Sequence, residues 1–283
     1  MTKKKNTSSM SDKLRDLENL LESMKKVAIA FSGGVDSTFL LAVAHKILKE
    51  NVLTVIAKSE TYPQREFQAA QNFVKKNNIK FEIINTKELS NPNFSTNPKD
   101  RCYFCKKELF TKMKKTAQKY DIDYLCDGSN ADDINDYRPG LQALQEMGIK
   151  SPLMQVGLTK KEIRILSKLI DLPTWEKPAY ACLSSRFPYG HEINKENLRM
   201  VEKAENFLME KGFKQVRVRH NQQTARIEVE QNNLSEILNK NTRERIIRKF
   251  KQIGYTYITV DLEGYRTGSM NEILKENYPA EKT

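Results

Sequence analysis

The feature that most constrains this chain is a short glycine-rich loop between an apolar strand and a helix. The run from Lys25 to Phe31 is typical of a buried strand, and helical spacing of apolar residues begins at Thr38. Ser32-Gly-Gly-Val-Asp-Ser37 lies between them. Because Gly33 and Gly34 have no side chains, the backbone there can approach a pyrophosphate and direct N–H groups at it. The N-terminus of the following helix adds partial positive charge, so the loop predicts a phosphate site.

The polar residues of this loop indicate phosphate chemistry with a magnesium ion. Ser32 and Ser37 can donate hydroxyl hydrogen bonds to phosphate oxygens, and the Asp36 carboxylate is favourable there when Mg²⁺ lies between it and the phosphates. The loop resembles the PP-loop of the N-type ATP pyrophosphatases and lacks the Gly-Lys-Ser/Thr ending of a Walker A loop. This resemblance implies that ATP is cleaved between its α- and β-phosphates. AMP is then placed on a carboxylate or carbonyl oxygen, and pyrophosphate is released.

Strand and helix signals alternate through the first part of the chain. Further strands are predicted at 52–57, 80–84 and 124–126, and helices at 64–76, 101–119 and 159–170. Thr159 and Glu162 have the spacing of a capping box at the start of the last helix. The alternation predicts an α/β fold with a doubly wound parallel sheet, and the PP-loop resemblance implies that it is adenine nucleotide alpha hydrolase-like.

The pattern changes after Pro188-Tyr-Gly190. Helices are predicted at 196–211 and 243–253, and strands at 215–220, 224–230 and 255–261, which together form a smaller α+β unit. We therefore expect a disordered basic tail at 1–16, a PP-loop ATP pyrophosphatase domain at 17–190, and a C-terminal domain at 191–283 for substrate recognition and oligomerisation.

Charge and hydropathy limit the possible partners. The 283 residues carry a net charge of +12, divided as +8 before Asn194 and +4 from there on. Because the basic residues are spread along the chain, with the densest clusters at 3–5 and 112–115, we expect no stable nucleic-acid binding. No apolar run approaches the roughly 18 residues that span a bilayer, and no apolar signal segment follows Met1. We expect a cytoplasmic protein that does not bind membranes.

The cysteines are too few for a disulfide scaffold, since the chain has only 4. Cys126 lies in an apolar strand and is predicted to be a core residue. Cys182 lies in the loop Lys177-Pro-Ala-Tyr-Ala-Cys-Leu-Ser-Ser-Arg186, where the two flanking cations would stabilise a thiolate. A small buried residue is the alternative interpretation of Cys182.

Three longer segments extend the comparison beyond the PP-loop. The residues from Pro178 to Arg186, Asp127-Gly-Ser-Asn-Ala-Asp-Asp133 followed by Asp136-Tyr-Arg-Pro-Gly140, and Asp261 to Glu272 together resemble the LarE family. The resemblance runs from about Leu17 to Leu274. Members of this family are ATP-dependent sulfur transferases that build the nickel-pincer cofactor of lactate racemase.

This resemblance implies a substrate, a sulfur source and an assembly. Pyridinium-3,5-biscarboxylic acid mononucleotide would be adenylated on a carboxylate and converted to a thiocarboxylate. In the simplest members the cysteine that matches Cys182 donates its own sulfur and is left as dehydroalanine. The resemblance also implies that Gly128 belongs to the ATP site and that the protein is a homo-oligomer.

Two more cysteines suggest another sulfur source. Cys102-Tyr-Phe-Cys105 and Cys182 supply three thiolates, which can hold a [4Fe–4S] cluster with one open iron for a sulfide. Some relatives carry such a cluster, and their cysteine is then not consumed. Two thiols on the first turn of a helix without any metal are the alternative. We favour the cluster, and sacrifice of Cys182 stays open.

Arginines of the C-terminal domain are candidates for substrate recognition. Arg217 and Arg219 share one face of a predicted strand and Arg226 follows on the next, an arrangement that suits bidentate bonds to phosphate and carboxylates. A solvated strand face is the alternative. The resemblance adds Ser185 and Arg186 to this site, and Tyr103 is a candidate lining residue. Among the histidines, His45 is predicted to be structural, His220 is a weak candidate, and His191 carries no signal.

Other functions fit parts of the sequence. A tRNA-thiolating PP-loop enzyme would explain the loop, three cysteines and the basic charge, but no RNA-binding domain or basic stripe is visible. An ammonia-using ligase would leave the cysteines without a role, and no glutaminase motif is present. A non-catalytic nucleotide-binding module is disfavoured by Asp36.

Overall fold

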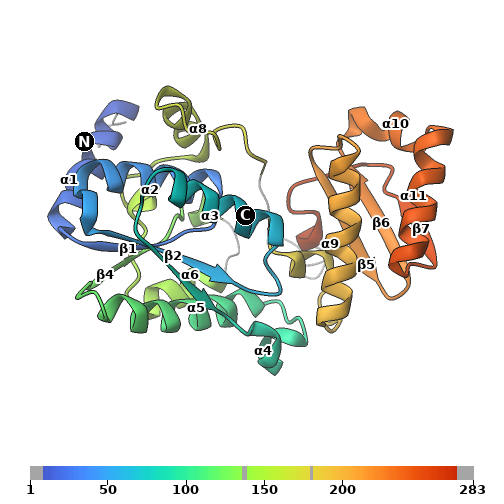
Figure 1. Cartoon of the computed structure of the whole chain (residues 1–283), viewed down its shortest axis with the longest axis horizontal. Coiled ribbons are helices and arrows are strands. Elements are labelled where there is room, and N and C mark those ends of the chain that lie inside the picture. The colour runs from blue at the N-terminus through green and yellow to red at the C-terminus, as the bar shows by residue number, and fades with distance from the viewer. Residues whose placement is uncertain (1–8, 136–138, 179–180, 273–283) are drawn as a thin grey trace, which may run out of the picture. The chain divides into compact units, whose positions relative to one another are not determined.

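The chain divides into two units, each built around its own sheet (Figure 1). The first unit comprises Met1–Glu88 and Asp100–Tyr180, and the second comprises Leu89–Lys99 and Ala181–Thr283. This computed structural model describes residues 9–135, 139–178 and 181–272. The lysine cluster at 3–5, residues 136–138 of the acidic motif, and residues 179–180 of the cysteine loop lie outside the described residues.

Four parallel strands form the sheet of the first unit. They are β1 (Val27–Ala30), β2 (Val52–Lys58), β3 (Phe81–Asn85) and β4 (Tyr124–Cys126), in the order β3-β2-β1-β4. The predicted α/β parallel sheet is therefore confirmed. Because the chain moves outward from β1 to β3 and then returns to the other side of β1, the strand order reverses between β1 and β4. In such sheets, ligands bind beyond the carboxyl ends of the strands at this reversal.

Helices cover both faces of this sheet, so the first unit has two apolar cores. The helices are α1 (Met10–Met24), α2 (Val35–Leu48), α3 (Gln64–Lys76), α5 (Arg101–Gln118), α6 (Pro139–Glu146), α7 (Pro152–Gln155) and α8 (Lys160–Leu169). One core gathers buried residues of α1, α2, α3 and α8, including Phe39 and Ile163. The other gathers those of α5 and α6, including Phe110 and Leu144.

The N-terminal helix begins earlier than the sequence predicts. A basic tail was predicted through residue 16, whereas α1 begins at Met10. Ser9 and Asp12 form a capping box there, and Leu17 and Leu21 are fully buried. Burial of this apolar stripe stabilises the helix, although its first turn is polar.

The second unit holds a three-stranded mixed sheet. Its strands are β5 (Val216–Asn221), β6 (Thr224–Val229) and β7 (Tyr257–Val260), and its helices are α4 (Pro92–Ser95), α9 (Lys195–Glu210), α10 (Leu234–Leu238) and α11 (Lys240–Ile253). Strand β6 pairs with β5 antiparallel and with β7 parallel. Alternate strand residues such as Val218 and Ile227 join α9 and α11 in the core, which leaves Arg219 and Arg226 on the other face.

The segment before residue 190 packs within the second unit. The sequence predicts one domain over residues 17–190, whereas the second unit starts at Ala181 and includes the excursion Leu89–Lys99. Asn97 in that excursion donates its side-chain amide to the carbonyls of Phe187 and Pro188, and Gly190 N–H donates to Asn97 O. These hydrogen bonds tie the two segments together. In the described part of the chain, no helix combines the length and the apolar character needed to cross a membrane.

Candidate functional site

The PP-loop, Ser32–Ser37, connects the carboxyl end of β1 to α2. Gly33 has a φ of +61°, and a Cβ atom there would lie 3.2 Å from Ala70 Cβ on α3. Gly34 is extended and directly precedes α2, whose first turn begins at Val35. The loop therefore requires glycine and ends at a helix N-terminus, as expected of a phosphate cradle.

The two serines of the loop lie next to each other. Ser32 Oγ and Ser37 Oγ are 3.1 Å apart, and Ser37 Oγ also donates to Gly34 O at 3.3 Å. The hydroxyls thus line the same short stretch of backbone as the loop N–H groups. This proximity fits the predicted role of both residues in phosphate binding.

Asp36 carries a buried oxygen that suits a metal ion. Its Oδ2 pairs with Lys160 Nζ, while its Oδ1 is buried and has no hydrogen-bond partner among the residues that the structure describes. Burial raises the pKa of Asp36 above its ordinary value, and Lys160 opposes that rise. An unpartnered buried carboxylate oxygen is costly unless a ligand satisfies it, so Asp36 fits the predicted Mg²⁺ site.

Gly128 brings the end of β4 against the PP-loop helix. A Cβ at this position would lie 3.0 Å from Ser37 N and 3.2 Å from Ser37 Cα, which is too close for a side chain. The adjacent Asp127 is buried and accepts hydrogen bonds from Ser129 Oγ and Ser151 Oγ, both at 2.7 Å. The two strand ends on either side of the sheet reversal therefore meet at the loop.

Two lysines at this site were not assigned to ATP binding from the sequence. Lys160 is the first residue of α8, where the Thr159 capping box fixes the turn, and its Nζ contacts Asp36. Lys177 Nζ donates to Gly33 O at 2.9 Å and pairs with Glu66 Oε2 at 2.5 Å. The capping box was a usable signal for Lys160. The sequence indicates Lys177 only as a cation close to Cys182.

The Cys-x₂-Cys pair lies where the sequence placed it, at the start of α5. Cys102 is exposed and Cys105 is half-buried, and Cys105 Sγ lies 3.8 Å from Glu88 Oε1. Tyr103 donates its hydroxyl to Glu146 on α6 at 2.5 Å and accepts from Lys107 at 3.0 Å. Tyr103 thus contacts charged side chains of α5 and α6.

The remaining cysteines differ in environment. Cys126 is fully buried, and burial raises the pKa of its thiol to about 12, so its prediction as a core residue is confirmed. Cys182 is half-buried and immediately precedes the short 3₁₀ helix Leu183–Arg186 of the second unit. Within either unit, the described Cys, His, Asp and Glu side chains form no group of three or more that could hold a metal ion.

Arg186 is a buried organiser of the cysteine loop. Its Nε and Nη2 donate to the two carboxylate oxygens of Glu205 on α9, each at 2.8 Å. Its Nη1 donates to Ala181 O, Cys182 O and Ser185 Oγ at 2.8–3.0 Å. Because the guanidinium binds these groups, Arg186 holds the backbone of Cys182 relative to α9.

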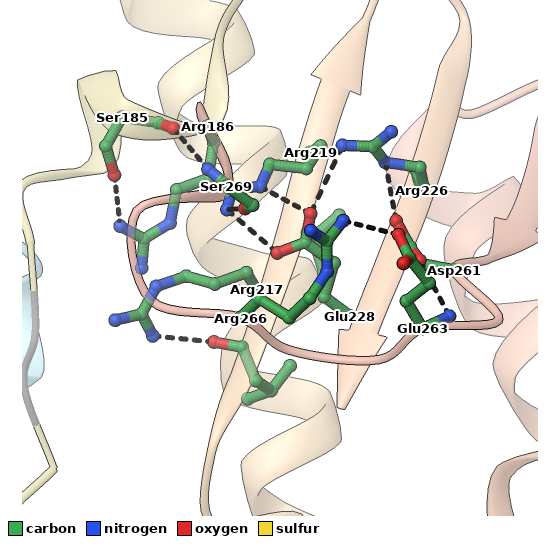
Figure 2. A network of polar contacts seen from close by, with 12 residues as sticks. Ser185, Arg186, Arg217, Arg219, Arg226, Glu228, Asp261, Glu263, Arg266 and Ser269 are labelled. Atoms are coloured by element: carbon green, nitrogen blue, oxygen red, sulfur yellow. Dashed lines mark hydrogen bonds and ion pairs between the residues drawn. The ribbon is translucent and has the colours of Figure 1, made fainter. Parts of the chain in front are cut away.

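Arg217 and Arg219 lie on the polar face of the second sheet (Figure 2). Arg219 makes a bidentate pair with Glu228, with both contacts at 2.8 Å, and donates to Ser185 O at 2.7 Å. Arg217 lies over the ring of Tyr265. Burial, followed by the charge of Arg186, lowers the pKa of Arg217.

A cavity of about 260 Å³ opens beside Arg219 within the second unit, and the predicted substrate residues Arg217 and Tyr103 are not among its lining residues. Its lining includes Ser185, Arg186, Arg219, Arg226 and Ser269. Arg226 is half exposed, pairs with Glu228 at 3.2 Å and lies 3.6 Å from Asp261. The structure thus brings most of the predicted substrate residues to one pocket.

Two of the histidines lie in different environments. His45 lies in the last turn of α2, and its structural role stays a prediction. His220 is buried between the rings of Phe187 and Tyr255 and also borders the cavity. Burial, and then His191, lowers the pKa of His220.

Comparison with known proteins agrees with this geometry. Residues 8–122 match the family model of NAD synthase, a region that includes the PP-loop. The chain is 34% identical over 267 residues to the pyridinium-3,5-bisthiocarboxylic acid mononucleotide synthase of Lactiplantibacillus plantarum, covering 94% of this chain and 96% of that protein.

Two uncharacterized proteins are also similar along most of their length. One, from Synechocystis sp., is 41% identical over 265 residues, covering 94% of this chain and 99% of that protein. The other, from Methanocaldococcus jannaschii, is 34% identical over 258 residues, covering 90% and 98%. The similarity therefore includes both units.

Proposed function

Because the chain belongs to the LarE family of pyridinium-3,5-bisthiocarboxylic acid mononucleotide synthases, we propose that it converts a carboxylate of pyridinium-3,5-biscarboxylic acid mononucleotide to a thiocarboxylate. It is an ATP-dependent enzyme of the PP-loop type. The observation that carries the proposal is the 34% identity to the synthase over 94% of the chain, together with a complete PP-loop. The product would serve nickel-pincer cofactor biosynthesis.

The first unit would perform the adenylation. The PP-loop N–H groups, Ser32 and Ser37 bind the ATP phosphates, and the buried Oδ1 of Asp36 would hold Mg²⁺. Mg²⁺, when bound, neutralises the charge of the pyrophosphate that leaves. The substrate carboxylate attacks the α-phosphorus, which gives an acyl-adenylate whose carbonyl carbon is open to a sulfur nucleophile.

The second unit would hold the mononucleotide. Arg217 and Arg219 suit its phosphate or its second carboxylate, since a guanidinium can bind either in a bidentate manner. The cavity beside Ser185 is supported as the binding site by the arginines that line it. Arg186, which binds Glu205 and the Cys182 carbonyl, would act by holding the cysteine loop.

For the sulfur source we favour a [4Fe–4S] cluster on Cys102, Cys105 and Cys182. Cys102 and Cys105 lie three residues apart on α5, so their thiolates lie on the same side of the helix, one turn apart. Cys182 would supply the third thiolate. A cluster bound by three thiolates supplies an open iron that can carry sulfide. Direct donation by Cys182, which would leave dehydroalanine, is the alternative.

Anaerobic incubation with ATP, the dicarboxylate mononucleotide and sulfide, which loads the open iron of the cluster, tests this function. We expect AMP, pyrophosphate and a product in which sulfur replaces one carboxylate oxygen, identified by mass spectrometry. Asp36→Asn should abolish pyrophosphate release, while the exposed matched control Asp16→Asn should not. Absence of the thiocarboxylate product would contradict the proposal. Separately, light scattering of the same sample tests whether the protein is the expected homo-oligomer.

Cysteine variants separate the two sulfur sources. With a cluster, Cys102→Ala and Cys105→Ala lose iron and sulfur transfer together, and the wild-type protein keeps its mass after turnover. With donation by Cys182, both variants stay active for one turnover, and the wild-type protein loses the mass of one H₂S. Cys126→Ala is the control, because its thiol lies in the core.

A further inference from the structure

Two carbonyl groups of the PP-loop are held by side chains from outside the loop. Tyr62 Oη donates to Ser32 O, and Lys177 Nζ donates to Gly33 O at 2.9 Å. Neither donor was assigned to the ATP site from the sequence. Both oxygens belong to peptide groups whose other end is a loop N–H.

Peptide planarity gives these two hydrogen bonds a consequence for the phosphate-facing side of the loop. In a trans peptide the C=O and the following N–H point in opposite directions, and the described residues contain no cis peptide bond. Holding Ser32 O therefore fixes the direction of Gly33 N–H, and holding Gly33 O fixes that of Gly34 N–H. Glycines would otherwise allow these peptides to rotate, because no side chain restricts them.

The two donors are themselves held in place. Lys177 Nζ pairs with Glu66, whose side chain is 7% exposed, and Arg164 on α8 donates to Lys177 O at 2.8 Å. Tyr62 packs against the core and directly precedes the turn into α3. Burial also raises the pKa of the Tyr62 hydroxyl, so it remains a protonated donor.

We infer that Tyr62 and Lys177 are positioning residues that orient the Gly33 and Gly34 N–H groups toward the pyrophosphate part of ATP. The inference rests on the proposed use of ATP by this loop. In this interpretation Lys177 holds the loop backbone by donating to Gly33 O, while Glu66 holds the Lys177 ammonium in place. Neither residue is required to touch the nucleotide.

Binding of inorganic pyrophosphate with Mg²⁺ to the full chain, measured by calorimetry, tests the inference. We expect Tyr62→Phe and Lys177→Met each to weaken binding about tenfold. In each variant one glycine N–H is no longer held toward the anion, and about tenfold corresponds to the loss of its charge-assisted hydrogen bond. The matched controls are Tyr120→Phe, whose hydroxyl binds Glu82, and Lys112→Met, whose Nζ binds Asn85 O and Glu108. Both controls should bind as wild type.

Glycine-selective ¹⁵N labelling reports the amide resonances of individual glycines, so it distinguishes a local change at the loop from a general loss of stability. Tyr62→Phe should shift the Gly33 amide resonance and Lys177→Met that of Gly34, with melting temperatures close to wild type. Wild-type pyrophosphate affinity in Tyr62→Phe, or weakened binding with unshifted glycine amides, would overturn the inference. If Lys177→Met does not fold, Tyr62→Phe, which removes a single oxygen atom, decides the question. Because pyrophosphate binding needs no sulfur transfer, failure of the proposed function is recognised separately, by the missing thiocarboxylate.

Discussion

Replacing Glu205 by glutamine should destabilise the second unit strongly. The side chains of Arg186 and Glu205 are 0% and 4% exposed, so their ion pair is shielded from water. Glutamine has nearly the same size and keeps one oxygen for Arg186 Nε and Val218 N–H, which both bind Glu205 Oε1. Its amide nitrogen, however, would face Arg186 Nη2, and two donors cannot bond.

The magnitude follows from these contacts. One charge-assisted hydrogen bond is lost, which costs about 1.5–3 kcal/mol, and the buried guanidinium loses its countercharge. Breaking one side of a buried ion pair costs about 3–5 kcal/mol in total. Because Arg186 also holds the carbonyl of Cys182, the same change should weaken sulfur transfer.

Native-state hydrogen exchange is the suitable assay, since the two units need not unfold together. We expect the amides of β5 and β6 to lose about 3–5 kcal/mol of protection in Glu205→Gln, while those of β1 and β2 are unchanged. Glu18→Gln is the matched control, because its partner Lys46 is 71% exposed and such pairs contribute at most about 1 kcal/mol. A loss below about 1 kcal/mol in Glu205→Gln would refute the reasoning.

Three further changes probe the two sites. Gly128→Ala should weaken binding of a non-hydrolysable ATP analogue at least about tenfold, because the new Cβ would meet main-chain atoms. In the control Gly140→Ala the new Cβ would meet the flexible Lys106 side chain, so this variant should bind the analogue normally. Lys160→Met should increase Mn²⁺ binding to the ATP-free protein, measured by electron paramagnetic resonance, because the ammonium no longer competes for Asp36; unchanged or weaker Mn²⁺ binding would contradict this. The lowered pKa of His220 means that the unfolded chain binds more protons below about pH 6.5, so the second unit should lose stability as pH falls from 7 to 5. In His220→Phe this loss should be smaller, and an identical pH dependence in urea unfolding would exclude His220 as its source.

The order of strands and helices could be predicted from the sequence because each element carries its own periodic signal. The helix Gln64–Lys76 and the strand Tyr124–Cys126 have the predicted bounds. The start of α1 was missed because its first turn is polar and its apolar stripe becomes evident only through Leu17 and Leu21. Short helices such as Leu234–Leu238 give too few residues for a pattern.

The phosphate site could be predicted because one short segment, the PP-loop, supplies its glycines, serines and carboxylate together. Gly33 needs a positive φ and Asp36 keeps a buried oxygen, both as the local motif implies. Tyr62 and Lys177 could not be found in this way, since each reaches the loop from another segment and neither carries a recognisable pattern. Their roles depend on long-range contacts, which local periodicity does not encode.

The arginines of the second unit also have contacts that the sequence alone could not predict. The sequence predicts that Arg186, Arg217 and Arg219 all bind the substrate, yet Arg186 and Arg219 each have a bidentate carboxylate partner, Glu205 and Glu228 respectively. Arg217 differs, because burial and the charge of Arg186 lower its pKa, so its charged form is less stable than that of an ordinary arginine. A bound anion would offset this repulsion and raise the pKa of Arg217 again. An anionic substrate near Arg217 is therefore expected to raise the pKa of this residue, while Arg186 and Arg219, through Glu205 and Glu228, also hold the cysteine loop and the sheet face in place.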